Sequence, residues 1–98
     1  MSIPPHSQSI SEAISDFLKD SGLEQTVLED RMVEKWNEVM GPQVARLTTK
    51  VEIRDRVLYA YIHSAALKAQ LFDCRFQLVE KLNNSVGGQV IRDIRILG

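Results

Sequence analysis

The sequence predicts an α+β domain with the element order α-α-β-β-α-β, in which helices cover one face of a small three-stranded mixed sheet. Three observations lead to this fold class. Apolar residues recur at helical spacing as far as Leu47, they alternate from Thr48 to His63, and helical spacing then returns before a final β-branched run. A chain of 98 residues has the length of one domain. We assign residues 1–8 to a disordered tail and residues 9–98 to the domain.

The first predicted helix begins at Ser9, which forms a capping box with Glu12. Gly22 is placed to end this helix, because glycine adopts the left-handed conformation common after a last helical turn. The apolar stripe of the helix consists of Ile10, Ala13, Ile14, Phe17 and Leu18.

A second helix is expected from about residue 24 to residue 40, where Gly41-Pro42 ends it. The following "QVARL" would add one short turn. The apolar face of this helix consists of Leu28, Met32, Trp36, Val39 and Met40. Because an indole buries a large apolar area, we interpret Trp36 as a core anchor, with a ligand contact as the alternative.

Two strands follow, and both alternate between apolar and polar residues. The first is "TTKVEIR" and the second is "VLYAYIH". Asp55-Arg56 separates the two runs, which predicts a tight hairpin.

A long helix of about 20 residues is then expected, with Ser64 as its cap and Gly87-Gly88 at its end. Its apolar stripe consists of Leu67, Leu71, Cys74, Leu78 and Leu82, flanked by Phe72, Val79 and Val86. Cys74 is interpreted as a small buried hydrophobe. The final run "QVIRDIRIL" predicts a third strand, in which Arg92 shares the parity of the inward residues unless a bulge lies near Ile91. The long helix would allow this strand to run parallel to the second.

The composition excludes several classes of protein. The single cysteine cannot form a disulfide within the chain. No apolar run approaches the ~18 residues of a membrane span. The first residues also lack the pattern of a secretory signal, so a cytoplasmic location is expected.

Charge is divided unevenly along the chain. Residues 1–45 contain three basic and eight acidic side chains, whereas residues 46–98 contain nine basic and five acidic ones. The two halves therefore differ in sign, at −5 and +4, although the whole chain carries only −1. Such asymmetry indicates a nucleic-acid or acidic-protein surface on the second half, with two ordinary solvated faces as the alternative.

Tyr59 and Tyr61 are the aromatic candidates for a binding surface. They are two residues apart on one strand and therefore share a face, which Lys50 and Arg54 of the preceding strand would join. Rings that stack on bases beside cations that contact phosphates suit single-stranded nucleic acid. Two alternatives remain open, a cross-strand pair that only stabilises the sheet and a face that docks another protein.

Two further cations complete the predicted site. Arg56 lies in the hairpin turn, and Lys68 lies near the start of the long helix, whose free N–H groups would suit a phosphate. The alternative for this helix start is a plain cap by Ser64.

Catalytic and metal chemistry are not expected. His63 and Ser64 are adjacent on a strand and face opposite ways, which is a poor geometry for a nucleophile pair. One cysteine and two distant histidines do not make a metal site, so neither a metal nor a cofactor is predicted. We therefore predict that the protein is not an enzyme.

Three stretches resemble the DciA family of bacterial replicative-helicase loaders and partners. They are "WNEVMGPQVARLT" with Trp36, Val39, Gly41 and Thr48, then "VLYAYIHSAALKAQL", and finally "LNNSVGGQVIRDIRI" with Leu82-Asn83. The match runs from Ile10 to Leu97.

This resemblance implies a KH-like fold with strand order 1-2-3 and strands 2 and 3 parallel. It also implies a bacterial cytoplasmic setting, contact with a DnaB-type helicase, and DNA binding. KH domains that bind single strands carry a G-x-x-G loop, and "SAAL" stands at that place here.

The resulting hypothesis is a non-catalytic nucleic-acid-associated module that works in DNA replication through a replicative helicase, with single-stranded or duplex DNA as a ligand. The alternative is a protein-interaction adaptor without direct nucleic-acid binding. The oligomeric state is left open, and no membrane partner is expected.

Overall fold

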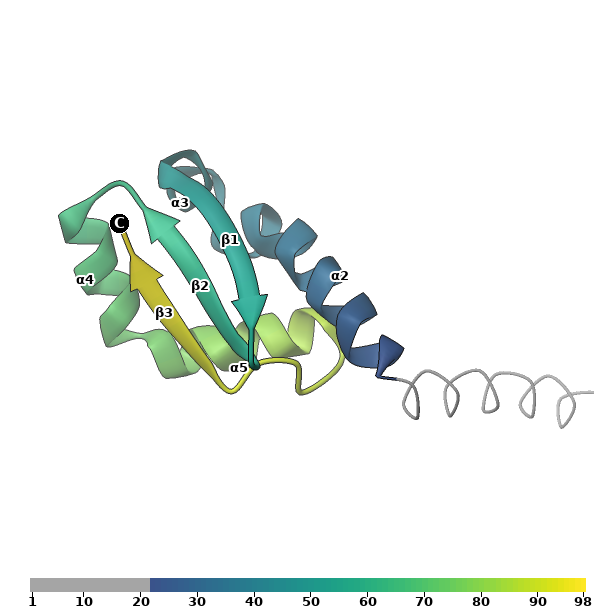
Figure 1. The fold of residues 1–98 in the computed structure, drawn as a ribbon. Coiled ribbons are helices and arrows are strands. Elements are labelled where there is room, and N and C mark those ends of the chain that lie inside the picture. The colour runs from purple at the N-terminus through teal and green to yellow at the C-terminus, as the bar shows by residue number, and fades with distance from the viewer. Residues whose placement is uncertain (1–21) are drawn as a thin grey trace, which may run out of the picture.

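Three strands form a mixed sheet in the computed structural model, which describes residues 22–98. The elements are α2 (Leu23–Met40), α3 (Pro42–Leu47), β1 (Thr48–Arg54), β2 (Val57–Ile62), α4 (Ala65–Asp73), α5 (Arg75–Val86) and β3 (Asp93–Leu97). The sheet order is β1-β2-β3, with β1 antiparallel and β3 parallel to β2. In Figure 1, α5 crosses behind the strands, so one face of the sheet is open to the viewer.

The predicted α+β class, the strand order and the parallel pair are confirmed. The KH-like relationship stays a prediction. The expected tail and the first helix lie outside the described residues.

The core lies between the sheet and the helices, and Trp36 is one of its largest side chains. Only 1% of its surface is exposed. Its Nε1 donates to Thr48 Oγ1 at 3.0 Å, and this hydroxyl in turn donates to the Val44 carbonyl at 2.7 Å. The interpretation of Trp36 as a core anchor is therefore confirmed, and its polar edge joins α2 to the start of β1.

The hairpin between β1 and β2 is as tight as predicted. Asp55 and Arg56 both adopt left-handed conformations, with φ of 51° and 65°. Two successive left-handed residues match the twist of the flanking strands. The turn is braced from outside, because the Arg56 carbonyl accepts from Arg92 N at 2.8 Å and the Arg56 guanidinium donates to the Gln89 carbonyl.

The prediction of one long helix after Ser64 is wrong. The helix breaks at Cys74, whose φ of −110° and ψ of 23° are not helical, and this break separates α4 from α5. Leu71 of α4 and Leu82 of α5 nevertheless belong to one core. Cys74 itself is partly buried and packs against the core, so its interpretation as a small buried hydrophobe holds only in part.

Phe72 also departs from the prediction. It was expected to flank the apolar stripe, but 54% of its surface is exposed. Phe72 follows the buried Leu71 in α4, and its side chain points about 100° away from that core-facing side.

The third strand begins at Asp93, four residues later than predicted. Val90 and Ile91 are both buried in the loop before it, where the amide of Asn83 holds them. Asn83 Oδ1 accepts from Val90 N at 2.9 Å and from Ile91 N at 3.0 Å, and Nδ2 donates to the Ile91 carbonyl at 2.9 Å. The predicted bulge near Ile91 is therefore replaced by a loop, and Arg92 no longer conflicts with the inward parity.

Candidate nucleic-acid interface

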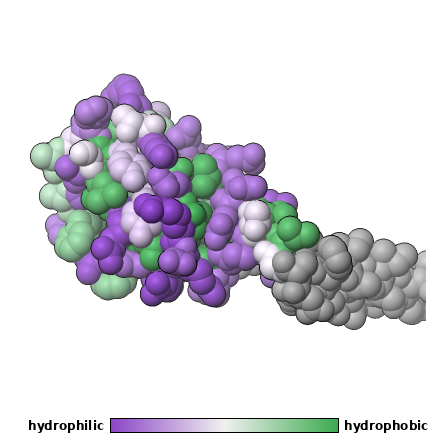
Figure 2. Space-filling model, viewed as in Figure 1, coloured by the Kyte–Doolittle hydropathy of each residue, from purple (hydrophilic) through white to green (hydrophobic). Residues whose placement is uncertain are grey.

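The uncovered side of the sheet brings together residues of all three strands. The register pairs Lys50 with Tyr61, Glu52 with Tyr59, and Tyr59 with Arg95. Paired residues lie on the same face of the sheet. The alternate residues of β2, namely Leu58, Ala60 and Ile62, are buried, so Tyr59 and Tyr61 lie on the uncovered face. We call this surface the open face; it consists of Lys50, Glu52, Arg54, Tyr59, Tyr61, Asp93, Arg95 and Leu97. Figure 2 shows a mostly hydrophilic surface over the strands in the same view.

Four of the predicted site residues meet on the open face. The Arg54 guanidinium carbon lies 4.4 Å from the centre of the Tyr59 ring, and Lys50 Nζ lies 5.8 Å from the centre of the Tyr61 ring. Both tyrosines are half-buried. Each ring therefore has a cation over it, which brings together the aromatic and positively charged groups that single-stranded nucleic acid uses.

Glu52 lies between the two cations and partly neutralises them. Its carboxylate is 3.0 Å from Lys50 Nζ and 3.1 Å from Arg54 Nε. The hydrogen bond from Lys50 holds the pKa of Glu52 below its usual value, and the charges of Lys50 and Arg54 act in the same direction. The two cations are thus held in place over the sheet, and their positive potential is reduced.

The third strand adds a further ion pair, between Arg95 Nε and an Asp93 carboxylate oxygen at 3.5 Å. Sequence reasoning missed Arg95 because its place opposite Tyr59 depends on the parallel register. Glu52 was detectable, since it has the parity of Lys50 and Arg54 on the same strand.

The remaining two predicted residues lie apart from this cluster. Arg56 is in the hairpin turn, where its guanidinium donates to the Gln89 carbonyl. Lys68 lies on α4, and its Nζ is 2.9 Å from the position that a Cβ on Gly98 would take. Ser64 Oγ accepts from Leu67 N at 3.1 Å, so one of the free N–H groups of this helix start already has a partner.

A groove of about 460 Å³ separates α2 from β1 and carries the opposite charge. Its carboxylates belong to Glu29, Asp30, Glu34 and Glu52, and Val33, Val51 and Ile53 line the rest. Such a groove repels a polyanion, so a nucleic acid would lie across the strands and away from α2.

Residues 22–98 contain no helix long and apolar enough to cross a membrane. Within the same range, no three histidine, cysteine or acidic side chains are grouped as metal ligands would be.

Comparisons with known proteins give one family and a set of mycobacterial relatives. The family model described as "Dna[CI] antecedent, DciA" matches residues 9–96. A "UPF0232 protein" of Mycobacterium bovis is 30% identical over 91 residues, which are 93% of this chain and 49% of the relative. The "UPF0232 protein in recF-gyrB intergenic region" of Mycolicibacterium smegmatis is 29% identical over 91 residues, covering 93% of this chain and 47% of the relative. The chain thus spans about half the length of these curated relatives.

Proposed function

Because the chain belongs to the DciA family, we propose that it is a non-catalytic nucleic-acid-associated module in DNA replication. Its protein partner would be a DnaB-type replicative helicase, which it helps to load or engages directly. The setting would be the bacterial cytoplasm. The family name, an antecedent of Dna[CI], supports the replication role.

The observation that carries nucleic-acid binding is the pair of cation–aromatic contacts on the open face. Arg54 lies over Tyr59, and Lys50 lies over Tyr61. Each pair joins a cation of β1 to a ring of β2, and the two pairs are neighbours on the sheet. Neighbouring bases of a single strand would stack on the two rings, while the cations contact the phosphates between them. Arg95 extends the positive charge to β3.

The test is fluorescence anisotropy with labelled single-stranded and duplex oligonucleotides at several salt concentrations. Tyr59→Ala and Tyr61→Ala should each cost roughly 1–3 kcal/mol on single strands and much less on duplex, whose bases are already stacked. Lys50→Ala and Arg54→Ala should each weaken the binding of both oligonucleotides, whatever their base sequence. Each should also flatten the slope of log affinity against log salt concentration by about one unit.

Lys81→Ala is the matched control, because this lysine is exposed on α5, behind the sheet. It should leave binding unchanged. Failure of the wild-type protein to bind either oligonucleotide at low salt would refute the nucleic-acid role.

The alternative function is a protein-interaction adaptor, and the neutralisation of the open face favours it. Glu52 and Asp93 pair with all three cations of this face. Biolayer interferometry with a purified DnaB-type helicase, in the presence and absence of nuclease, separates the two functions. Nuclease-resistant binding that Tyr59→Ala abolishes, with no oligonucleotide binding, would establish the adaptor.

A further inference from the structure

Exposed aromatic rings gather where α4 meets α5. Phe72 and Phe76 are 54% and 70% exposed, and Leu97 of β3 is 39% exposed. Phe72 and Leu97 line one hollow, and Phe76 adjoins it through Arg75. Rings this exposed contribute little to the core, so their apolar area is available to a partner.

Arg75 lies between the two rings and has unused hydrogen-bonding capacity. Its guanidinium carbon is 4.1 Å from the centre of the Phe72 ring and 4.7 Å from that of Phe76. Within the part of the chain that the structure describes, the guanidinium makes one hydrogen bond, from Nη1 to the Phe72 carbonyl at 3.2 Å. A guanidinium has five N–H donors, so a carboxylate can still bind it.

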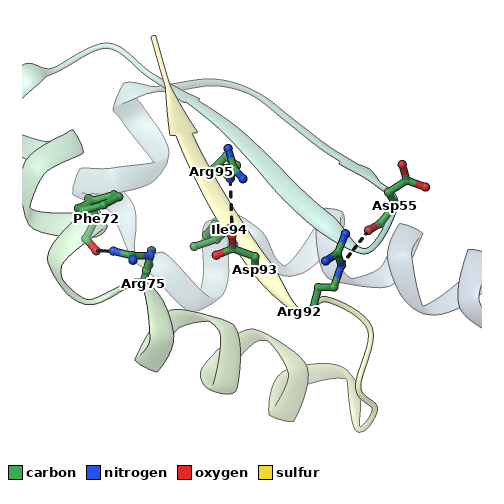
Figure 3. A network of polar contacts seen from close by, with 7 residues as sticks. All are labelled: Asp55, Phe72, Arg75, Arg92, Asp93, Ile94 and Arg95. Carbon is green, nitrogen blue, oxygen red and sulfur yellow. Dashed lines mark hydrogen bonds and ion pairs between the residues drawn. The ribbon is translucent and has the colours of Figure 1, made fainter.

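The hollow beside Arg75 runs along the free edge of the sheet. It has a volume of about 270 Å³ and is lined by Phe72, Arg75 and all of the residues Asp93–Leu97. Successive side chains of a strand point to opposite faces, so five consecutive residues can line one hollow only along the strand's edge. The described sheet ends at β3, which leaves this edge without a neighbouring strand. Figure 3 shows Phe72 and Arg75 beside β3.

We propose that this hollow, the β3 groove, binds an extended segment of a partner protein that adds a strand to β3. Backbone hydrogen bonds to the edge would align the segment. An apolar side chain of the segment would pack on Phe72 and Leu97, and a glutamate or aspartate would bind Arg75. The groove shares Asp93, Arg95 and Leu97 with the open face, but the proposal rests on the free edge of the sheet and the α4–α5 junction, and it does not use the tyrosines.

Charge and backbone chemistry favour a peptide as the occupant. Two arginines, Arg75 and Arg95, line the groove with a single carboxylate, Asp93, so the groove complements an acidic segment. A strand edge offers both N–H and C=O groups, and a peptide backbone satisfies both. A phosphate backbone has acceptors only, so it could not satisfy the carbonyl groups of the edge.

The test begins with selection from a library of random eight-residue peptides against the whole immobilised protein. Selected peptides should alternate apolar residues and carry an acidic residue at a fixed place. Their binding should shift the NMR amide signals of residues 93–97. Arg75→Gln should lower the affinity for these peptides by about tenfold, which is the effect of losing one charge-assisted hydrogen bond. Lys81→Gln, which removes an exposed charge on α5, should not weaken them.

Methylated peptides test strand addition directly. An added strand turns alternate N–H groups towards its neighbour, so N-methylation of one alternate set should abolish binding and that of the other set should be tolerated. Tolerance of both sets overturns the proposal. So does a failure to select any peptide, or unchanged affinity for the folded Arg75→Gln variant. A loss of oligonucleotide binding in Arg75→Gln, without any peptide binding, would assign the groove to nucleic acid instead.

Discussion

The indole of Trp36 fixes the corner where α3 passes into β1. Its rings fill the core, and its N–H binds the Thr48 hydroxyl that opens the strand. Asn83 has a corresponding place at the other end of the sheet, where one side chain satisfies the backbone of Val90 and Ile91. Both residues lie in the stretches that resemble the DciA family. The indole N–H of Trp36 thus helps to set the start of β1, and the amide of Asn83 helps to set the start of β3.

Trp36→Ala should destabilise the fold by about 3–5 kcal/mol, because it empties a core position. Thr48→Val should cost about 1–3 kcal/mol, since it leaves the buried indole N–H without its acceptor. Thr49→Val, at an exposed neighbouring position, is the control and should cost little. Thermal melts measure all three. A near-wild-type melting temperature for Trp36→Ala, with binding lost, would instead identify Trp36 as a ligand contact.

Asn83→Ala should destabilise the protein by at least about 2 kcal/mol. The substitution removes three buried hydrogen bonds to the backbone of Val90 and Ile91, and each unsatisfied group costs about 1–3 kcal/mol. Asn84→Ala is the matched control, because its side chain is exposed on the same helix. Equal urea midpoints for the two variants would show that the loop before β3 does not depend on the amide.

At the scale of the element, β1 combines the cations of the open face with their counter-charge. Lys50, Glu52 and Arg54 follow one another on the same side of the strand. The strand therefore holds Lys50 and Arg54 on the face proposed for phosphate contact. It also holds the Glu52 carboxylate, which would compete with a phosphate for these two cations. In the proposed nucleic-acid complex this competition would set the affinity, because a phosphate would have to displace Glu52 from the two cations.

Glu52→Gln should raise affinity for single-stranded oligonucleotides and steepen the salt slope, because it frees Lys50 and Arg54. Glu34→Gln, which removes an exposed carboxylate from the acidic groove, is the control. Anisotropy titrations measure both. A lower affinity in Glu52→Gln would mean that the carboxylate is needed to orient the cations.

The same carboxylate should make stability depend on pH. The pKa of Glu52 is lowered in the folded state, mainly by the hydrogen bond from Lys50, relative to an ordinary value of 4.5. Its stabilising contribution is therefore present above pH 4.5 and is lost as the pH falls through the lowered pKa. The stability difference between wild type and Glu52→Gln should shrink over that range in urea titrations. A difference independent of pH would exclude the ion pairs as its source.

At the scale of the whole molecule, the charge difference between the two halves of the sequence becomes a difference between surfaces. Three acidic residues of α2 line the groove towards β1, and the cations lie over the strands. An approaching polyanion is therefore oriented with α2 directed away from it. The β3 groove lies at the far edge of the sheet from α2.

Deletion of residues 1–8 should leave both stability and binding unchanged. This expectation comes from the sequence, where Pro4 and Pro5 stand among few apolar residues with no periodic pattern. Thermal melts and oligonucleotide anisotropy of the shortened chain check it. A large drop in the melting temperature would assign part of the fold to these residues.

The sequence by itself determined the features that depend on local periodicity. Alternation over residues 48–63 predicted the hairpin, and the parity of Tyr59 and Tyr61 predicted that both rings leave the sheet together. Helical spacing also placed Trp36 in the core. These features follow from the period of two in a strand and 3.6 in a helix, which neighbouring residues set without reference to the rest of the chain.

Only the tertiary structure decided where elements break and which distant residues meet. Helical spacing continues through Cys74, yet the backbone there is not helical, and α4 and α5 enter the core as two separate helices. Phe72 and Phe76 lie exposed on the two sides of this break, around Arg75. The start of β3 depends in the same way on Asn83, and the place of Arg95 opposite Tyr59 depends on the parallel register. Each is set by packing between segments far apart in sequence, which no local pattern encodes.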